Sequence, residues 1–229
     1  MILPKPLLHC AAAAAVAVIA TPASAADDSQ LWAGGSVTAK LSDHWRLSQE
    51  ITVRFSDNRN WLYEVESNTL LGYRVDKGVT VWGGYTHDPQ YSAGDFTVME
   101  HRAREQVTVD TLAEVGGGKL SGRMRMEQRW RDGLDGTGWR VRPYLKYALP
   151  LHKGGRTAVV VSVEPFFNLN TTAFQRKSGL DRVRTFVGFS IPLAKSLSAE
   201  AGYLNQHTLV PNGPDTDDHV ASIALSFSL

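Results

Sequence analysis

Arginines recur two residues apart in two neighbouring parts of the stretch from Ser121 to Leu149. Alternation with apolar residues places the charged groups on one face of a predicted strand and the apolar side chains on the other. Guanidinium groups bind carboxylates and other anions through paired N–H donors. These arginines could therefore pair with carboxylates of the protein or select an anionic ligand, and the choice depends on what each face of the strands contacts.

The same alternation extends over most of the chain and predicts an all-β fold. It divides the chain into about eleven segments of roughly ten residues, the length that a tilted strand needs to cross an outer membrane. The first segment is residues 30–41 and the last is Val220 to Leu229. Single-chain bacterial barrels have even strand numbers. We therefore expect a transmembrane antiparallel up-and-down β-barrel of about twelve strands, with ten as the other admissible count.

The connections between these segments also alternate in length. Short connections are predicted at residues 76–78, 113–118, 150–155 and 193–195. Longer, more polar connections are predicted at residues 88–99, 131–138, 170–179 and 207–218. Short periplasmic turns and long external loops are typical of outer-membrane barrels. Aromatic residues on the apolar faces near strand ends, Tyr63 among them, are typical of interfacial girdles, although a soluble β-protein would use such residues in its core.

The N-terminus has the pattern of a secretory signal peptide. Lys5 precedes an apolar run and a small-residue site at Ala23 and Ala25, which predicts a signal peptide over residues 1–25 and a barrel domain over residues 26–229. Cys10 lies in the signal peptide, so the mature chain would have neither a disulfide nor a thiol nucleophile. Removing Lys5 leaves 23 basic and 23 acidic residues, a formally neutral chain. Export excludes nucleic acid as a partner.

Charged residues on the polar faces of the segments are predicted to form the interior of the barrel. The candidate lumen residues are Arg46, Arg54, Arg102, Arg104, Arg123, Arg125, Arg129, Arg140, Arg142, Arg182, Arg184, Glu50, Glu127, Glu164 and Glu200. Arg74, Lys146, Glu64, Glu66 and Asp110 share these faces. Two interpretations are open. The lumen could be filled by a network of arginine–carboxylate pairs, or the excess of arginine could line a narrow, anion-selective pore.

An outer-membrane lipid-modifying enzyme is a third possibility. Such an enzyme needs a serine and histidine, or a histidine-centred site, near the rim. His87, His101, His207 and His219 fall at predicted strand ends or loops, but their spacing to Ser92 or to nearby aspartates is not diagnostic. We therefore expect no catalytic residues, metal or cofactor. The acidic run from Asp215 to His219 lacks the remainder of a calcium-binding loop.

Several blocks of the sequence resemble a family of uncharacterised proteobacterial outer-membrane proteins, grouped as domain-of-unknown-function family 2490. The blocks are Glu164-Pro165-Phe166-Phe167-Asn168-Leu169-Asn170, the ladder Arg123/Arg125/Glu127/Arg129, Trp139-Arg140-Val141-Arg142-Pro143-Tyr144, Arg184-Thr185-Phe186-Val187-Gly188 and Gly202-Tyr203-Leu204-Asn205-Gln206. The resemblance covers nearly all of the mature chain, and Glu-Pro-Phe-Phe is its most specific part. It implies an outer-membrane β-barrel but no ligand or catalytic residue.

The sequence thus predicts a porin-like protein of the bacterial outer membrane that passes or binds small anionic solutes. The alternatives are a closed structural barrel and a lipid-modifying enzyme. The expected partners are outer-membrane lipids, a small anionic solute and the barrel-assembly machinery, which would recognise the C-terminal strand Val220 to Leu229. Met124, Met126, Val141 and Leu145 are expected to face lipid.

Overall fold

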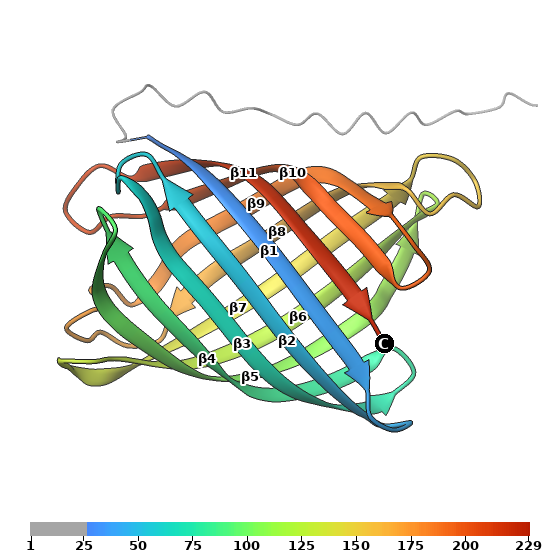
Figure 1. Cartoon of the computed structure of the whole chain (residues 1–229), viewed down its shortest axis with the longest axis horizontal. Coiled ribbons are helices and arrows are strands. Elements are labelled where there is room, and N and C mark those ends of the chain that lie inside the picture. Colours follow the sequence, from blue (N-terminus) through green and yellow to red (C-terminus); the bar gives the residue numbers. More distant parts are fainter. Residues whose placement is uncertain (1–26) are drawn as a thin grey trace, which may run out of the picture.

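A computed structural model describes residues 27–229 of the protein, and the signal peptide predicted over residues 1–25 lies outside the described residues. The described chain forms one closed β-barrel, shown from the side in Figure 1. No helix long enough and apolar enough to cross a membrane occurs in this part of the chain.

Eleven strands form the wall, and each pairs with its sequence neighbours. They are β1 (Asp28–Lys40), β2 (Trp45–Ser56), β3 (Trp61–Asp76), β4 (Val79–Ser92), β5 (Asp95–Val115), β6 (Gly118–Arg131), β7 (Leu134–Pro150), β8 (Ala158–Asn168), β9 (Gly179–Pro192), β10 (Leu197–Thr208) and β11 (Thr216–Ser228). Burial alternates residue by residue along β8, whose valines lie on both faces. The period of two that predicted the strands therefore also fixes which face each side chain occupies.

The number of strands differs from the predicted twelve or ten. β1 and β11 pair in parallel, with Gln30 opposite Val220 and Ser36 opposite Ser226, whereas all the other neighbours are antiparallel. An even count follows only if the first and last strands run in opposite directions. A parallel closing pair requires an odd count, so the eleven segments counted in the sequence were correct and the parity argument was wrong.

Because β1 and β11 run in the same direction, the first strand begins at one end of the barrel and the last strand finishes at the other. We call the end where β1 begins and the long β8–β9 and β10–β11 connections lie the N-terminal end, and the end where β11 finishes the C-terminal end (Figure 1). Two of the predicted long loops are wrong. The strands continue through most of residues 88–99 and 131–138, and two-residue turns at Ala93-Gly94 and Asp132-Gly133 join them. Positive φ angles of 51° and 87° at Ala93 and Gly94 suit a tight hairpin.

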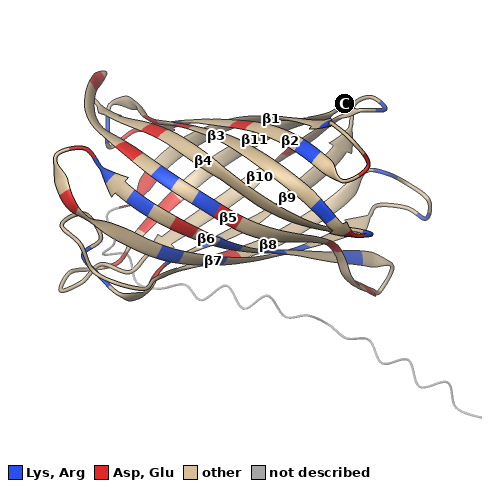
Figure 2. Cartoon of the chain, turned by 90° about the horizontal axis from the view of Figure 1, so that it is seen from below, with Lys and Arg blue, Asp and Glu red and all other residues tan. Residues whose placement is uncertain are grey.

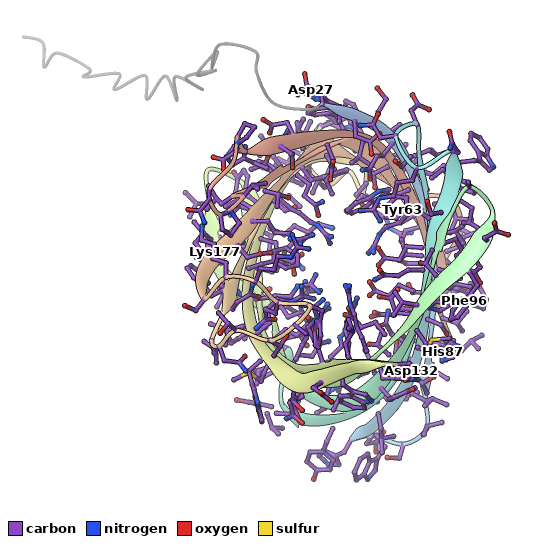
Figure 3. The ribbon with its side chains drawn as sticks, turned by 90° about the vertical axis from the view of Figure 1, so that its left-hand side faces the viewer. Asp27, Tyr63, His87, Phe96, Asp132 and Lys177 are labelled. Carbon is purple, nitrogen blue, oxygen red and sulfur yellow. The ribbon has the colours of Figure 1, made fainter. Side chains whose placement is uncertain are left out.

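The interior of the barrel is polar and its exterior is apolar. Among the described residues, 22 polar or charged side chains are buried and only eight hydrophobic ones are. Large hydrophobic side chains instead lie exposed on the outer surface, including Met124, Leu145 and Ile223. In Figure 2 the charged positions follow the strands instead of being confined to the turns. Figure 3, which looks along the barrel, shows side chains pointing inwards around a central space.

One predicted exterior aromatic points inwards instead. The register between β2 and β3 shifts so that Arg54 faces Glu64 but Phe55 faces Leu62, leaving Tyr63 as the extra residue of a β-bulge. Tyr63 is only 6% exposed, and its hydroxyl donates a hydrogen bond to Oε1 of Gln30 at 2.8 Å. The bulge therefore moves Tyr63 from the expected girdle into the lumen (Figure 3).

Candidate functional site

The structure places all the predicted lumen residues on inward-facing positions, but it does not gather all of them into one group. Arg46 lies near the C-terminal end, where it donates to the backbone oxygens of Ser42 and Trp45 at 2.9 and 3.0 Å. It borders a cavity of about 530 Å³ there together with Arg74. Glu200 pairs with Lys146, away from the other predicted acidic residues. The remaining predicted residues form the middle of the lumen and its N-terminal half.

Glu127 lies at the centre of the two neighbouring arginine-rich strands, β6 and β7. Its carboxylate accepts hydrogen bonds from Arg140 Nε at 2.8 Å and from Arg142 Nη1 at 2.6 Å, and Arg125 lies 3.6 Å away. The pairing of β6 with β7 brings these residues together, because Glu127 lies directly opposite Arg140 and Arg125 opposite Arg142. Three guanidinium groups thus share one carboxylate that is 1% exposed.

Glu100 is the centre of a second group of arginines, and it was not among the predicted lumen residues. It has no exposed surface, and it accepts hydrogen bonds from Arg102 at 2.6 Å, Arg129 at 2.8 and 2.9 Å, and Arg131 at 2.6 Å. A loop was predicted up to residue 99 and the next strand from residue 102, which left Glu100 unassigned. The period of two continues through Glu100, Arg102 and Arg104, and extending the strand backwards would have found it.

A third group combines carboxylates that could in principle hold a cation. Ligand oxygens of Glu64, Glu66 and Asp88 lie within 4.8 Å of one another. Arg54 pairs with both glutamates, and Arg102 pairs with Glu66 at 3.1 Å and with Asp88. Two guanidinium groups already supply the positive charge that a divalent ion would bring. The donor set therefore fits an ion-pair network better than it fits a metal centre.

These ion pairs run along the wall of the barrel. Opposite strands in a ring of eleven are five or six steps apart. In residues 27–229, no ion pair joins strands more than three steps apart. The widest spans are Arg104 on β5 with Glu50 on β2, at 3.0 Å, and Lys146 on β7 with Glu200 on β10. The charged side chains therefore line the lumen, and none of these pairs crosses it.

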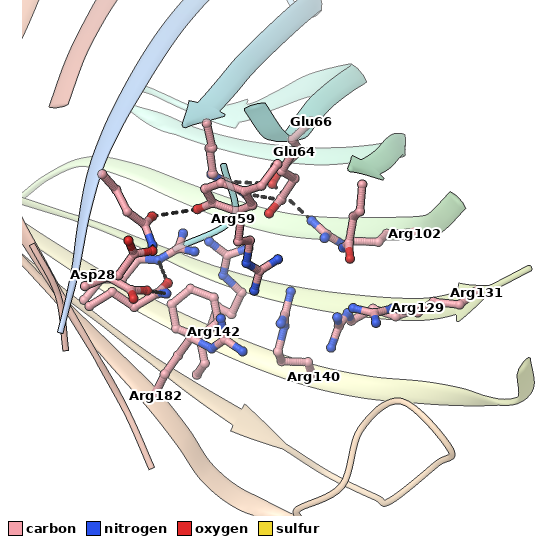
Figure 4. A pocket seen from close by; sticks show the side chains of 18 residues that line it. Asp28, Arg59, Glu64, Glu66, Arg102, Arg129, Arg131, Arg140, Arg142 and Arg182 are labelled. Atoms are coloured by element: carbon pink, nitrogen blue, oxygen red, sulfur yellow. Dashed lines mark hydrogen bonds and ion pairs between the residues drawn. The ribbon is translucent and has the colours of Figure 1, made fainter. Parts of the chain in front are cut away.

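A cavity of about 180 Å³ opens within this charged region at the N-terminal end (Figure 4). We call it the arginine cavity. Its lining includes nine arginines, which are Arg54, Arg59, Arg102, Arg129, Arg131, Arg140, Arg142, Arg182 and Arg184. It includes four carboxylates, which are Asp28, Glu64, Glu66 and Asp218. Arg140, Arg142 and Arg182 lie on one side of the cavity in Figure 4, opposite Glu64 and Glu66. The lining carries a formal excess of positive charge.

Two aromatic rings inside the barrel, Trp32 and Phe166, were not predicted to belong to the site. Phe166 is 1% exposed and has guanidinium groups stacked around it, with Arg142 4.1 Å and Arg184 4.7 Å from the ring centroid. Trp32 has Arg54 and Arg184 each 4.5 Å from its ring centroid. Alternation along the first segment and along Glu-Pro-Phe-Phe places both rings on the lumen face, and this was the available signal.

The connection between β8 and β9 reaches back over the N-terminal opening. Gln175 in this loop is 2% exposed, and its amide accepts from Arg129 at 3.2 Å and donates to the backbone oxygen of Asn170 at 2.9 Å. The ring of Phe174 lies 5.7 Å from the guanidinium carbon of Arg129 and 5.3 Å from that of Arg131. The loop is therefore attached to the wall of the arginine cavity.

The histidines of the enzymatic alternative lie on the outer surface. His101 contacts the hydroxyl of Tyr85, and His207 lies 3.1 Å from Asp217. Among the described residues, no serine or threonine hydroxyl is hydrogen-bonded to an imidazole. The arrangement offers histidine–aspartate contacts on the outer surface.

Together these features define a class of protein, the closed up-and-down β-barrel with an apolar exterior and an arginine-rich interior. The chain belongs to the family described as "Protein of unknown function (DUF2490)", whose model matches residues 29–217, and this confirms the resemblance found in the sequence. An uncharacterised protein of Methylorubrum extorquens is 30% identical over 217 residues, covering 93% of this chain and 94% of the relative.

A comparison with solved structures finds similarity to LpxR from Salmonella typhimurium. The two chains are 9% identical, with a TM-score of 0.48, over 80% of this chain and 83% of the other.

Proposed function

We propose that the protein is embedded in the bacterial outer membrane. The polar lumen and the exposed apolar side chains of the outer surface support this, because a soluble barrel would bury those side chains. Strands of 11 to 21 residues are long enough to cross the bilayer at the usual tilt. Outer-membrane lipids would contact Met124, Met126, Val141 and Leu145. The assembly machinery would recognise the C-terminal strand, β11.

Within that membrane, we propose that the barrel passes or binds small anionic solutes through its lumen. The observation that carries this proposal is the lining of the arginine cavity, which contains nine arginines and four carboxylates. Excess guanidinium groups in a narrow space lower the electrostatic energy of an anion and raise that of a cation. The proposal includes no catalytic step, metal or cofactor.

The path of the ion pairs favours a lined lumen over a closed structural barrel. A plug would be expected to join opposite walls, whereas these pairs connect strands at most three steps apart among the described residues.

Conductance of the purified protein in a planar bilayer tests this function. We expect an ion current and, under a gradient of potassium chloride, a reversal potential on the anion-selective side. Arg125→Ala and Arg142→Ala should each reduce the anion preference, since each removes a lumen charge. Lys153→Ala, an exposed position in the β7–β8 turn, is the matched control and should leave selectivity unchanged. Absence of current, or current without anion preference, would exclude the channel.

A further inference from the structure

Four arginines surround a single phenylalanine in the wall of the arginine cavity. The guanidinium carbons of Arg140, Arg142, Arg182 and Arg184 lie 5.1, 4.1, 5.8 and 4.7 Å from the ring centroid of Phe166. The cluster forms because β8 lies between β7 and β9. Phe166 lies directly opposite Arg182 on β9, and Arg140 and Arg142 belong to β7. Stacking on an aromatic face is favourable for a guanidinium group.

A second aromatic ring, Trp32, adds to this cluster. Arg184 lies between two rings, 4.7 Å from Phe166 and 4.5 Å from Trp32, and Arg54 stacks on Trp32 as well. Stacking occupies the faces of a guanidinium group but leaves its N–H edges available. The rings can therefore hold these side chains in position without using their hydrogen-bond donors.

The hydrogen bonds of the four arginines show which donors are in use. Arg142 donates to Glu127 and Glu164, and Arg140 donates to Glu127 from Nε and Nη2. Arg182 and Arg184 donate only from Nε, to Asp181 at 2.8 Å and to Gln206 at 2.7 Å. Within residues 27–229, the terminal nitrogens of Arg182 and Arg184 and Nη1 of Arg140 have no acceptor. All three side chains border the arginine cavity.

We propose that these three arginines, held by Phe166 and Trp32, form a binding site for a compact dianionic oxyanion, a phosphate or a dicarboxylate. Several free N–H donors around one cavity of about 180 Å³ match a small ligand with several acceptor oxygens and more than one negative charge. Chloride or acetate would accept hydrogen bonds from only some of these N–H groups. This inference rests on the proposed function and narrows it, because it gives the lumen a preference among anions.

Titration calorimetry of the full protein in detergent tests the site, with inorganic phosphate at pH 8, malonate and acetate as separate probes. We expect phosphate or malonate to bind at least ~10-fold more tightly than acetate. Arg184→Gln should weaken the binding of whichever dianion binds more tightly by about tenfold or more. Arg182→Gln provides a second variant if the first fails to fold. Arg156→Gln, exposed in a turn at the C-terminal end, is the control and should change affinity less than about twofold.

Phe166 is a positioning residue in this site, and its variants separate positioning from general stability. Phe166→Leu removes the ring but keeps the four arginines, and it should weaken dianion binding. Phe166→Tyr keeps the ring and should restore binding. Equal affinity for acetate and both dianions, or unchanged dianion affinity in both arginine variants, overturns the inference. Anion current without a preference for dianions would support the channel and overturn this site. Dianion binding without current would support this site and overturn the channel.

Discussion

Arg129 donates two hydrogen bonds of 2.8 and 2.9 Å to Glu100, whose carboxylate has no exposed surface. Arg102 and Arg131 donate to the same carboxylate, each at 2.6 Å. One negative charge therefore neutralises much of the repulsion among three guanidinium groups.

Replacing Glu100 with Gln should destabilise the barrel, because three buried or half-buried arginines would lose their shared counter-charge. We expect a loss of about 3–5 kcal/mol, the usual cost of breaking a buried ion pair on one side. Thermal unfolding in detergent, followed by circular dichroism, measures this. Glu114→Gln, an exposed carboxylate of the same strand, is the control and should change stability little. A loss below ~1 kcal/mol for Glu100→Gln would mean that the three-arginine centre contributes little.

Two adjacent glycines of β4 should respond differently to alanine. A Cβ added at Gly84 would lie 2.2 Å from the backbone oxygen of Thr69 and 2.5 Å from Cδ2 of Leu70, whereas one added at Gly83 would meet nothing within 4 Å. Gly84→Ala should therefore cost about 1–3 kcal/mol or more. Gly83→Ala should stay within about 0.5 kcal/mol of the wild type. Heat-dependent gel mobility reports both, and equal behaviour would be inconsistent with the inward position of Gly84.

The parallel closure predicts which positions can be cross-linked. Ala33 lies opposite Ile223, so Ala33→Cys with Ile223→Cys in a Cys10→Ser background should form a disulfide on oxidation. Ala39→Cys with Ile223→Cys is the control, since six residues along a strand separate the two sites by about 20 Å. Gel mobility under non-reducing conditions distinguishes the two pairs. Efficient cross-linking of the control pair alone would show a different register at the seam.

Gln175 should hold the β8–β9 loop against the arginine cavity. Gln175→Ala removes the hydrogen bond from Arg129 and the amide donor to Asn170, so the loop should become more accessible to protease and the single-channel current should rise. Thr171→Ala, at an exposed position of the same loop, is the control. Unchanged protease sensitivity and current in Gln175→Ala would show that the loop neither depends on this contact nor narrows the entrance.

The alternation of residues was sufficient to predict the fold and the inward faces, because a period of two assigns every side chain of a strand. It did not identify Glu100, because β5 begins at Asp95 and not at residue 102 as predicted. It did not place Tyr63, because a bulge reverses the face locally. The number of strands depends on whether β1 and β11 pair in parallel. That contact joins segments far apart in the sequence, so alternation within each segment does not determine it. The cluster around Phe166 likewise depends on how three strands are aligned, which alternation within one strand does not determine.

The pairing of the first strand with the last also has a consequence for the order of folding. The strands β2 to β10 pair with sequence neighbours through short or moderate connections, so each hairpin closes a small loop. Gln30 and Val220, by contrast, must meet across nearly the whole chain. Loop-closure entropy grows with the number of residues enclosed, and contacts of large sequence separation slow folding. Joining β1 to β11 should therefore be the last and slowest step, and until then the growing sheet has two free edges.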